Sequence, residues 1–198
     1  MAEAGKADAG REAGGIWTWR NKTGVACVAM LHLAALYALL STEFGPVAIT
    51  LSLLAWLFVN CLVLVFLPRP GVAAALALAL TVVLIALSRF KFDILQLTLT
   101  FLDFLIIDRD TFSFLLSVFP RLKLPLLLAA VAAVPVLWLV WRTDPFRISR
   151  RVSLALLTFA AVSISGMAIA VPEQPWEPFQ GVNHISSLAR SGVVAASR

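Results

Sequence analysis

Side chains able to do chemistry are nearly absent from the long apolar segments of this chain. His32 lies inside one of these segments. It could be a proton or ligand site, but we favour the interpretation that it packs between helices and forms a hydrogen bond to a neighbouring carbonyl. Cys27 and Cys61 have no nearby histidine or carboxylate, which a zinc site would require. So few intramembrane ionisable groups disfavour a transporter or channel, and we predict no cofactor, metal ligand or catalytic residue in this chain.

The informative polar residues surround a 14-residue apolar run, 94–107. A membrane-crossing helix needs about 17–25 residues, so this run is too short to span, and it contains Asp103. On one helix the polar residues of the region would share a stripe: Asp93, Gln96, Thr100, Asp103 and Asp110. A second short helix is expected over 111–119, ended by Pro120. The pattern predicts a pair of interfacial amphipathic helices within residues 89–120.

Basic residues flank this predicted helix pair at the depth of lipid headgroups. Two interpretations stay open: a docking surface for a headgroup or for a domain above the membrane, or a simple amphipathic anchor. The candidate lipid-interface residues are Arg89, Lys91, Asp93, Gln96, Asp103, Arg109 and Arg121.

The elements that must position these residues follow from composition. Of 198 residues, 61% are apolar and 14% charged, and the mean hydropathy is +0.93. A soluble domain is only about 45–50% apolar and about 25% charged. Five stretches nearly free of charge match the bilayer's hydrocarbon core, and they are apolar on every face, which favours helices over barrel strands: 23–40, 46–67, 71–87, 122–141 and 152–171. We predict an all-α integral membrane protein with five transmembrane helices, the interfacial pair lying between the third and fourth.

The flanking segments and the orientation complete the expected organisation. Residues 1–22 are expected to be a disordered cytoplasmic tail, and 172–198 an extracytoplasmic linker, stiffened by prolines, with a modest helix after Asn183 and a further domain beyond it. Basic residues before the first span and at 142–151 place the amino terminus inside and the carboxyl terminus outside. The net charge of +5 lies mainly in these cytoplasmic segments, so membrane lipids rather than nucleic acids are the expected partners.

A family resemblance follows from this layout and from residues 183–193, which read NHISSLARSGV. Together they resemble the N-terminal membrane domain of lipoteichoic-acid-synthase-like proteins, over roughly residues 23–198. These are phosphoglycerol or phosphoethanolamine transferases of the bacterial cytoplasmic membrane, within the alkaline phosphatase and sulfatase superfamily. The resemblance implies that a threonine nucleophile and a divalent metal act in an extracytoplasmic domain after the linker, and this sequence contains neither.

Three functional hypotheses result. In the first, the chain is the membrane-anchoring, lipid-substrate-presenting half of a lipid-headgroup transferase and is inactive by itself. In the second, it is a small integral-membrane scaffold or assembly subunit that binds partner helices without catalysis. In the third, it is a lipid-binding module without catalysis, which would use the same interfacial helix.

Overall fold

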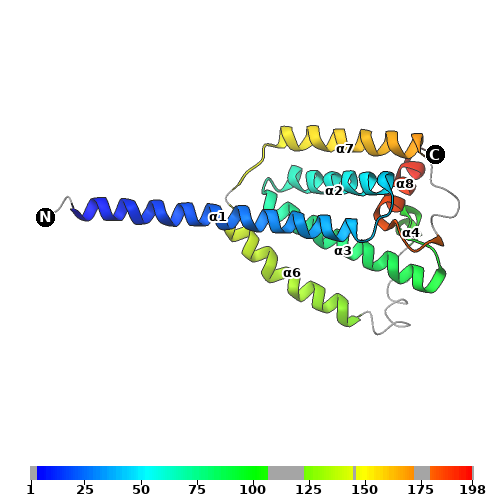
Figure 1. The fold of residues 1–198 in the computed structure, drawn as a ribbon, viewed down its shortest axis with the longest axis horizontal. Helices are drawn as coiled ribbons and strands as arrows, with labels where there is room; N and C mark the ends of the chain where they lie inside the picture. The colour runs from blue at the N-terminus through cyan, green and yellow to red at the C-terminus, as the bar shows by residue number, and fades with distance from the viewer. Residues whose placement is uncertain (1–3, 107–122, 145, 172–178, 198) are drawn as a thin grey trace.

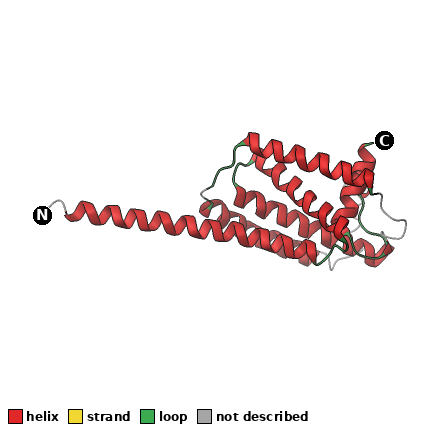
Figure 2. Ribbon diagram, turned by 45° about the horizontal axis from the view of Figure 1, so that its top comes forward, coloured by secondary structure: helices red, strands yellow, loops and turns green. Residues whose placement is uncertain are grey.

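The computed structural model describes residues 4–106, 123–144, 146–171 and 179–197, and within these ranges the chain is helical and contains no strand (Figures 1 and 2). The prediction of an all-α chain is confirmed. The described helices are α1 (Ala4–Leu40), α2 (Pro46–Phe66), α3 (Pro70–Leu95), α4 (Phe101–Ile106), α6 (Lys123–Thr143), α7 (Arg150–Ala170) and α8 (His184–Ala196).

Four helical segments are long and apolar enough to cross a membrane: Lys22–Leu40, Pro46–Phe66, Pro70–Leu95 and Arg150–Ala170. They coincide with four of the five expected spans. The remaining expected span, 122–141, falls on α6, of which the stretch Ala133–Thr143 is a shorter apolar helix segment. Both α2 and α3 begin with a proline in their first turn, where the missing N–H has no helical partner to lose.

The helices form a bundle with a distinct cluster of elements at one end. α2 packs against both α3 and α7, and α1 packs against α3. α4 and α8 contact each other at the end of the bundle where α3 finishes and α2 begins (Figure 1). α6 runs obliquely back to the opposite end, where it contacts α3 and α1.

The structure differs from the expected disordered tail at residues 4–22. These residues continue α1, which extends beyond the bundle as a single helix (Figure 1). The segment contains as many glycines as alanines, four of each, and it prolongs a helix already nucleated by the membrane span. Each added residue therefore gains a backbone hydrogen bond without a new nucleation cost.

The prediction that the apolar run 94–107 lies on one continuous helix is wrong. α3 continues past residue 87 to Leu95, and Gln96 then adopts the left-handed conformation at φ 55°, which ends the helix. After a non-helical connection α4 begins at Phe101. The periodicity of polar and apolar residues did not predict this break, because Gln96 and Thr100 are compatible with the polar face of a helix as well as with a helix cap. The second predicted helix, 111–119, lies outside the described residues.

Candidate functional site

Glu43, in the turn between α1 and α2, is a buried carboxylate that binds the start of α8. Its side chain is 2% exposed and accepts hydrogen bonds from the Ile185 N–H at 2.7 Å and the Ser186 hydroxyl at 2.5 Å. The first N–H groups of a helix lack intrahelical acceptors and carry partial positive charge, so a carboxylate is stabilised there. Glu43 therefore caps α8 across a sequence separation of 142 residues.

Asn183 precedes α8 and makes the complementary contacts to the same turn. Its φ is 64°, its backbone N–H donates to the Thr42 carbonyl at 3.1 Å, and its Oδ1 accepts from the Phe44 N–H at 2.7 Å. Because the Asn183 side chain binds the turn, it makes no cap hydrogen bond to its own helix. The two elements are thus joined reciprocally: Glu43 caps α8, and Asn183 satisfies the backbone beside Glu43.

The electrostatics of this contact favour a partly protonated carboxyl group. Burial raises the pKa of Glu43 to about 6, while the hydrogen bonds from Ser186 and Ile185 and the positive charge of Arg190 act in the opposite direction. Arg190 is itself buried, at 7% exposure, on α8. The junction therefore contains a titratable acid whose protonation changes within the physiological range.

His184 and Ser88 form a second buried contact between α8 and the bundle. His184 Nδ1 lies 2.8 Å from Ser88 Oγ, and Ser88 Oγ accepts the Leu99 N–H at 3.0 Å. Burial, followed by the charge of Arg89, lowers the pKa of His184, which favours the neutral ring. A serine next to a histidine is also the geometry of an activated nucleophile. Here the exposures are 0% for Ser88 and 2% for His184, so the pair fixes α8 and the 97–100 connection instead of facing a substrate.

Lys91 and Asp103 lie next to this contact and hold α4 in place. Their ion pair measures 2.7 Å, and Lys91 also donates to the Thr98 carbonyl at 3.1 Å. Asp103 accepts the Thr100 N–H at 2.6 Å and the Thr100 hydroxyl at 3.0 Å, so its carboxylate binds the backbone just before α4, as the acidic residue of a capping box does. Partial burial acts to raise the pKa of Asp103, but the hydrogen bonds from Lys91 and Thr100 lower it overall.

The structure brings together only part of the predicted lipid-interface set. Lys91 and Asp103 bind each other, whereas Arg89 and Asp93 are exposed near the end of α3 and Gln96 is an exposed helix cap. The expected polar stripe is therefore not formed by these residues. The remaining two members, Arg109 and Arg121, lie outside the described residues.

Sequence reasoning missed the residues that join α8 to the bundle. These are Glu43, Ser88, Asn183, His184 and Ser186. A signal existed in that Glu43 is the only charge between the first two spans, and the 183–187 string is rich in short polar side chains. Their pairing, however, depends on contacts between distant parts of the chain. His32 bonds the Val28 carbonyl of its own helix at 2.9 Å and meets the Trp56 ring edge-on, as a packing residue does.

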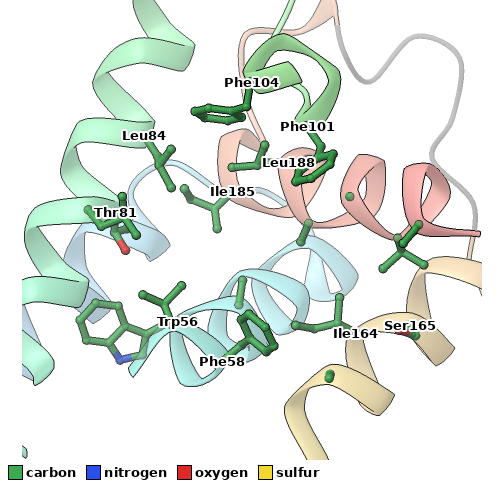
Figure 3. Close-up of a pocket in the computed structure, with 18 of the residues that line it drawn as sticks. Trp56, Phe58, Thr81, Leu84, Phe101, Phe104, Ile164, Ser165, Ile185 and Leu188 are labelled. Atoms are coloured by element: carbon green, nitrogen blue, oxygen red, sulfur yellow. The ribbon is translucent and has the colours of Figure 1, made fainter. Parts of the chain in front are cut away.

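An apolar cavity of about 730 Å³ lies beneath α8, between α2, α3 and α7 (Figure 3). Trp56 and Phe58 line it from α2, Leu84 from α3 and Ile164 from α7, while α8 and α4 cover it with Ile185, Leu188, Phe101 and Phe104. Its few polar lining residues are Thr81, Ser165 and Ser197. The polar junction of α8 thus adjoins a partly open apolar cavity between the helices.

The opposite end of the bundle is closed by a second carboxylate at a helix start. Asp144 accepts the Gly71 N–H at 2.6 Å, at the beginning of α3. Arg69 donates to the Trp141 carbonyl at 2.8 Å and lies over the Trp141 ring at 4.2 Å. These contacts attach the carboxyl end of α6 to the turn between α2 and α3.

Among the described residues, no three histidine, cysteine, aspartate or glutamate side chains gather closely enough to hold a metal ion. Comparison with protein-family models, curated proteins and solved structures finds no match for this chain. Over its described residues the chain is helical, and several of the helices are long and apolar enough to cross a membrane, as is typical of a multi-pass membrane protein.

Proposed function

We propose that this chain is the membrane-anchoring, lipid-presenting part of a lipid-headgroup transferase of the sulfatase-like superfamily. The observation that carries the proposal is the docking of α8. This helix follows the last span, yet Glu43, Ser88 and Thr42 bind its start through buried hydrogen bonds. A domain attached beyond α8 would therefore be held in a defined position over the membrane end of the bundle, where a lipid headgroup lies.

The proposal includes five membrane spans with α6 as the fourth. In support, α6 has 21 residues, and it runs obliquely from a start set apart from the other helices to the α2–α3 turn (Figure 1). That end also gathers a set of arginines: Arg69, Arg142, Arg147, Arg150 and Arg151. By the positive-inside rule this end is cytoplasmic, which places Glu43, α4 and α8 outside the cytoplasmic membrane of a bacterium.

The proposed headgroup contact uses the exposed basic residue at the outer end, Arg89. An arginine can bind a phosphate through two parallel N–H donors, and a basic group near an anionic surface contributes about 1 kcal/mol. Lys91 forms an ion pair with Asp103, so we assign it the structural role of holding α4 against α3. Arg109 and Arg121 remain proposed headgroup contacts on sequence grounds. The chain itself is proposed to have no transferase activity, with the divalent metal and nucleophile belonging to a downstream domain.

Lipid analysis of the purified chain tests this function. Lipids that co-purify in a mild detergent are identified by mass spectrometry and compared with those of the host membrane. We expect enrichment of phosphoglycerol or phosphoethanolamine lipids, and loss of that enrichment in Arg89→Gln. Arg147→Gln, which removes an exposed charge at the opposite end of the bundle, is the matched control and should retain it.

The scaffold hypothesis is the alternative, and the extension of α1 beyond the bundle favours it because residues 4–22 offer a long helix to a partner. Its signature differs from that of lipid presentation. A membrane-protein partner retained in stoichiometric amount, with a lipid composition equal to that of the host membrane, would contradict the transferase proposal. Deleting residues 4–19 should then release that partner.

A further inference from the structure

We propose that the cavity under α8 binds one hydrocarbon chain of a lipid from the outer leaflet, with α8 as its cover. This inference rests on the proposed function in taking the chain as membrane-embedded and oriented with α8 outside. It goes further in assigning a site and a ligand class to the cavity.

The chemistry of the walls selects an apolar occupant. The volume of about 730 Å³ falls within the range of about 300–1,000 Å³ seen for small-molecule sites. Three of the walls, α2, α3 and α7, are helices apolar enough to cross a membrane. Water needs two to four polar partners, which this lining does not supply, and an empty space would forfeit the packing contacts of its walls. Bilayer hydrocarbon is the apolar material available on every side.

The cavity extends from the α8 end of the bundle to about the middle of α2 and α7. On α7 the lining runs from Ile169, next to the helix end at Ala170, down to Ala161. At 1.5 Å per residue this reaches about 14 Å below the end of the helix, close to half of a hydrocarbon core about 30 Å thick. On α2 the lining residues Ala55 to Val59 lie deeper, about 14–20 Å from Pro46. The cavity therefore fits part of a lipid chain that enters from the α8 side.

The face of α8 that lines the cavity carries small residues, which leave the space unfilled. Ile185, Leu188 and Val193 supply apolar surface, and the small residues Ala189 and Gly192 lie between them on the cavity side. A Cβ atom at Gly192 would stand 3.7 Å from the Phe101 ring, so the smaller residue is not required by a backbone clash. The small side chains instead keep the cover from filling the cavity.

Photocrosslinking in lipid nanodiscs tests this site. The probes are phosphatidylglycerol and phosphatidylcholine that carry the same diazirine-labelled acyl chain. We expect labelling of cavity residues such as Ile164 and Leu84 with both probes, because the chain and not the headgroup enters the site. Ala161→Trp fills the cavity from α7 and should abolish this labelling. Val162→Trp, on the neighbouring residue that is 67% exposed, is the matched control and should preserve it.

The outcomes separate this inference from the proposed function. Unchanged labelling of Ile164 in Ala161→Trp, or no labelling of Ile164 and Leu84 in the native chain, would overturn the cavity assignment even if the headgroup preference at Arg89 were intact. Equal binding of the two lipids with strong cavity labelling would contradict the transferase proposal alone. Should Ala161→Trp fail to fold, Ser165→Leu narrows the same wall with a smaller change, and the same loss of labelling is expected.

Discussion

Replacing Glu43 with alanine tests whether one buried carboxylate fixes α8 to the bundle. The substitution removes the acceptor for the Ile185 N–H and the Ser186 hydroxyl. The pKa of Glu43 is raised to about 6 with both hydrogen bonds in place, so these bonds and the desolvation of the carboxylate do not add as separate terms. The loss is that of buried donors left without their acceptor: about 1–3 kcal/mol for the Ile185 N–H, and up to about 1 kcal/mol for the Ser186 hydroxyl, which can rotate. The net loss expected for α8 docking at pH 7 is therefore about 1–4 kcal/mol.

Hydrogen–deuterium exchange in nanodiscs measures this loss directly. Amides of α8 exchange through its detachment, so a docking loss of about 1–4 kcal/mol accelerates them about 5- to 1,000-fold. Trypsin cleavage after the buried Arg190 provides a second measure of the same opening. Glu43→Gln is the matched control, because its amide oxygen still accepts from the Ile185 N–H, and it should protect α8 nearly as well as the native residue. Equal exchange in Glu43→Ala and the native chain would refute the reasoning.

Three further predictions concern the same end of the bundle. Because the pKa of Glu43 is raised, its contribution to the stability of α8 docking is greatest below pH 4.5 and decreases as the pH rises through about 6. Because the pKa of His184 is lowered, its contribution is complete above pH 6.5 and is lost on acidification. Because the intrinsic exchange rate of an amide itself falls with pH, protection relative to that rate is compared. Lowering the pH from 7 to 5 should lower the protection of α8 in Glu43→Gln and raise it in His184→Gln, and the same trend in both would contradict this assignment. Asp103→Ala, which loses the cap and the ion pair of α4, should cost about 1–2 kcal/mol and appear as faster exchange confined to residues 100–106. Gly181→Ala should lower the melting temperature, because φ is 67° and its Cβ would lie 2.6 Å from the Phe92 ring, and an unchanged melting temperature would argue against this backbone geometry.

The membrane character and the helix positions could be predicted from sequence because they depend on local properties. A run of apolar residues long enough for the bilayer identifies a span wherever it lies in the chain, and Pro46 and Pro70 mark helix starts by their missing N–H groups. The start of α8 directly after Asn183 was predicted in the same way. The break of the helix at Gln96 was not predicted, because periodicity alone does not distinguish Asp103 on a polar stripe from Asp103 at the start of a new helix.

Neither the contacts that join α8 to the bundle nor the cavity beneath it could be predicted from the sequence, because both depend on the tertiary structure. Glu43 and Ile185 are 142 residues apart, and Ser88 and His184 are 96 apart, so no local pattern reveals either pair. A lone glutamate in a short turn is expected to be solvated; it becomes a buried helix cap only because the end of α1 and the start of α8 meet at the same end of the bundle. The space under α8 likewise exists because three separate helices and a cover leave it unfilled. The segments that must leave water can be identified from the sequence, because burial in the membrane depends on the apolar surface that each segment carries. The hydrogen-bond partners of the few buried polar groups cannot, because they depend on how those segments pack against each other.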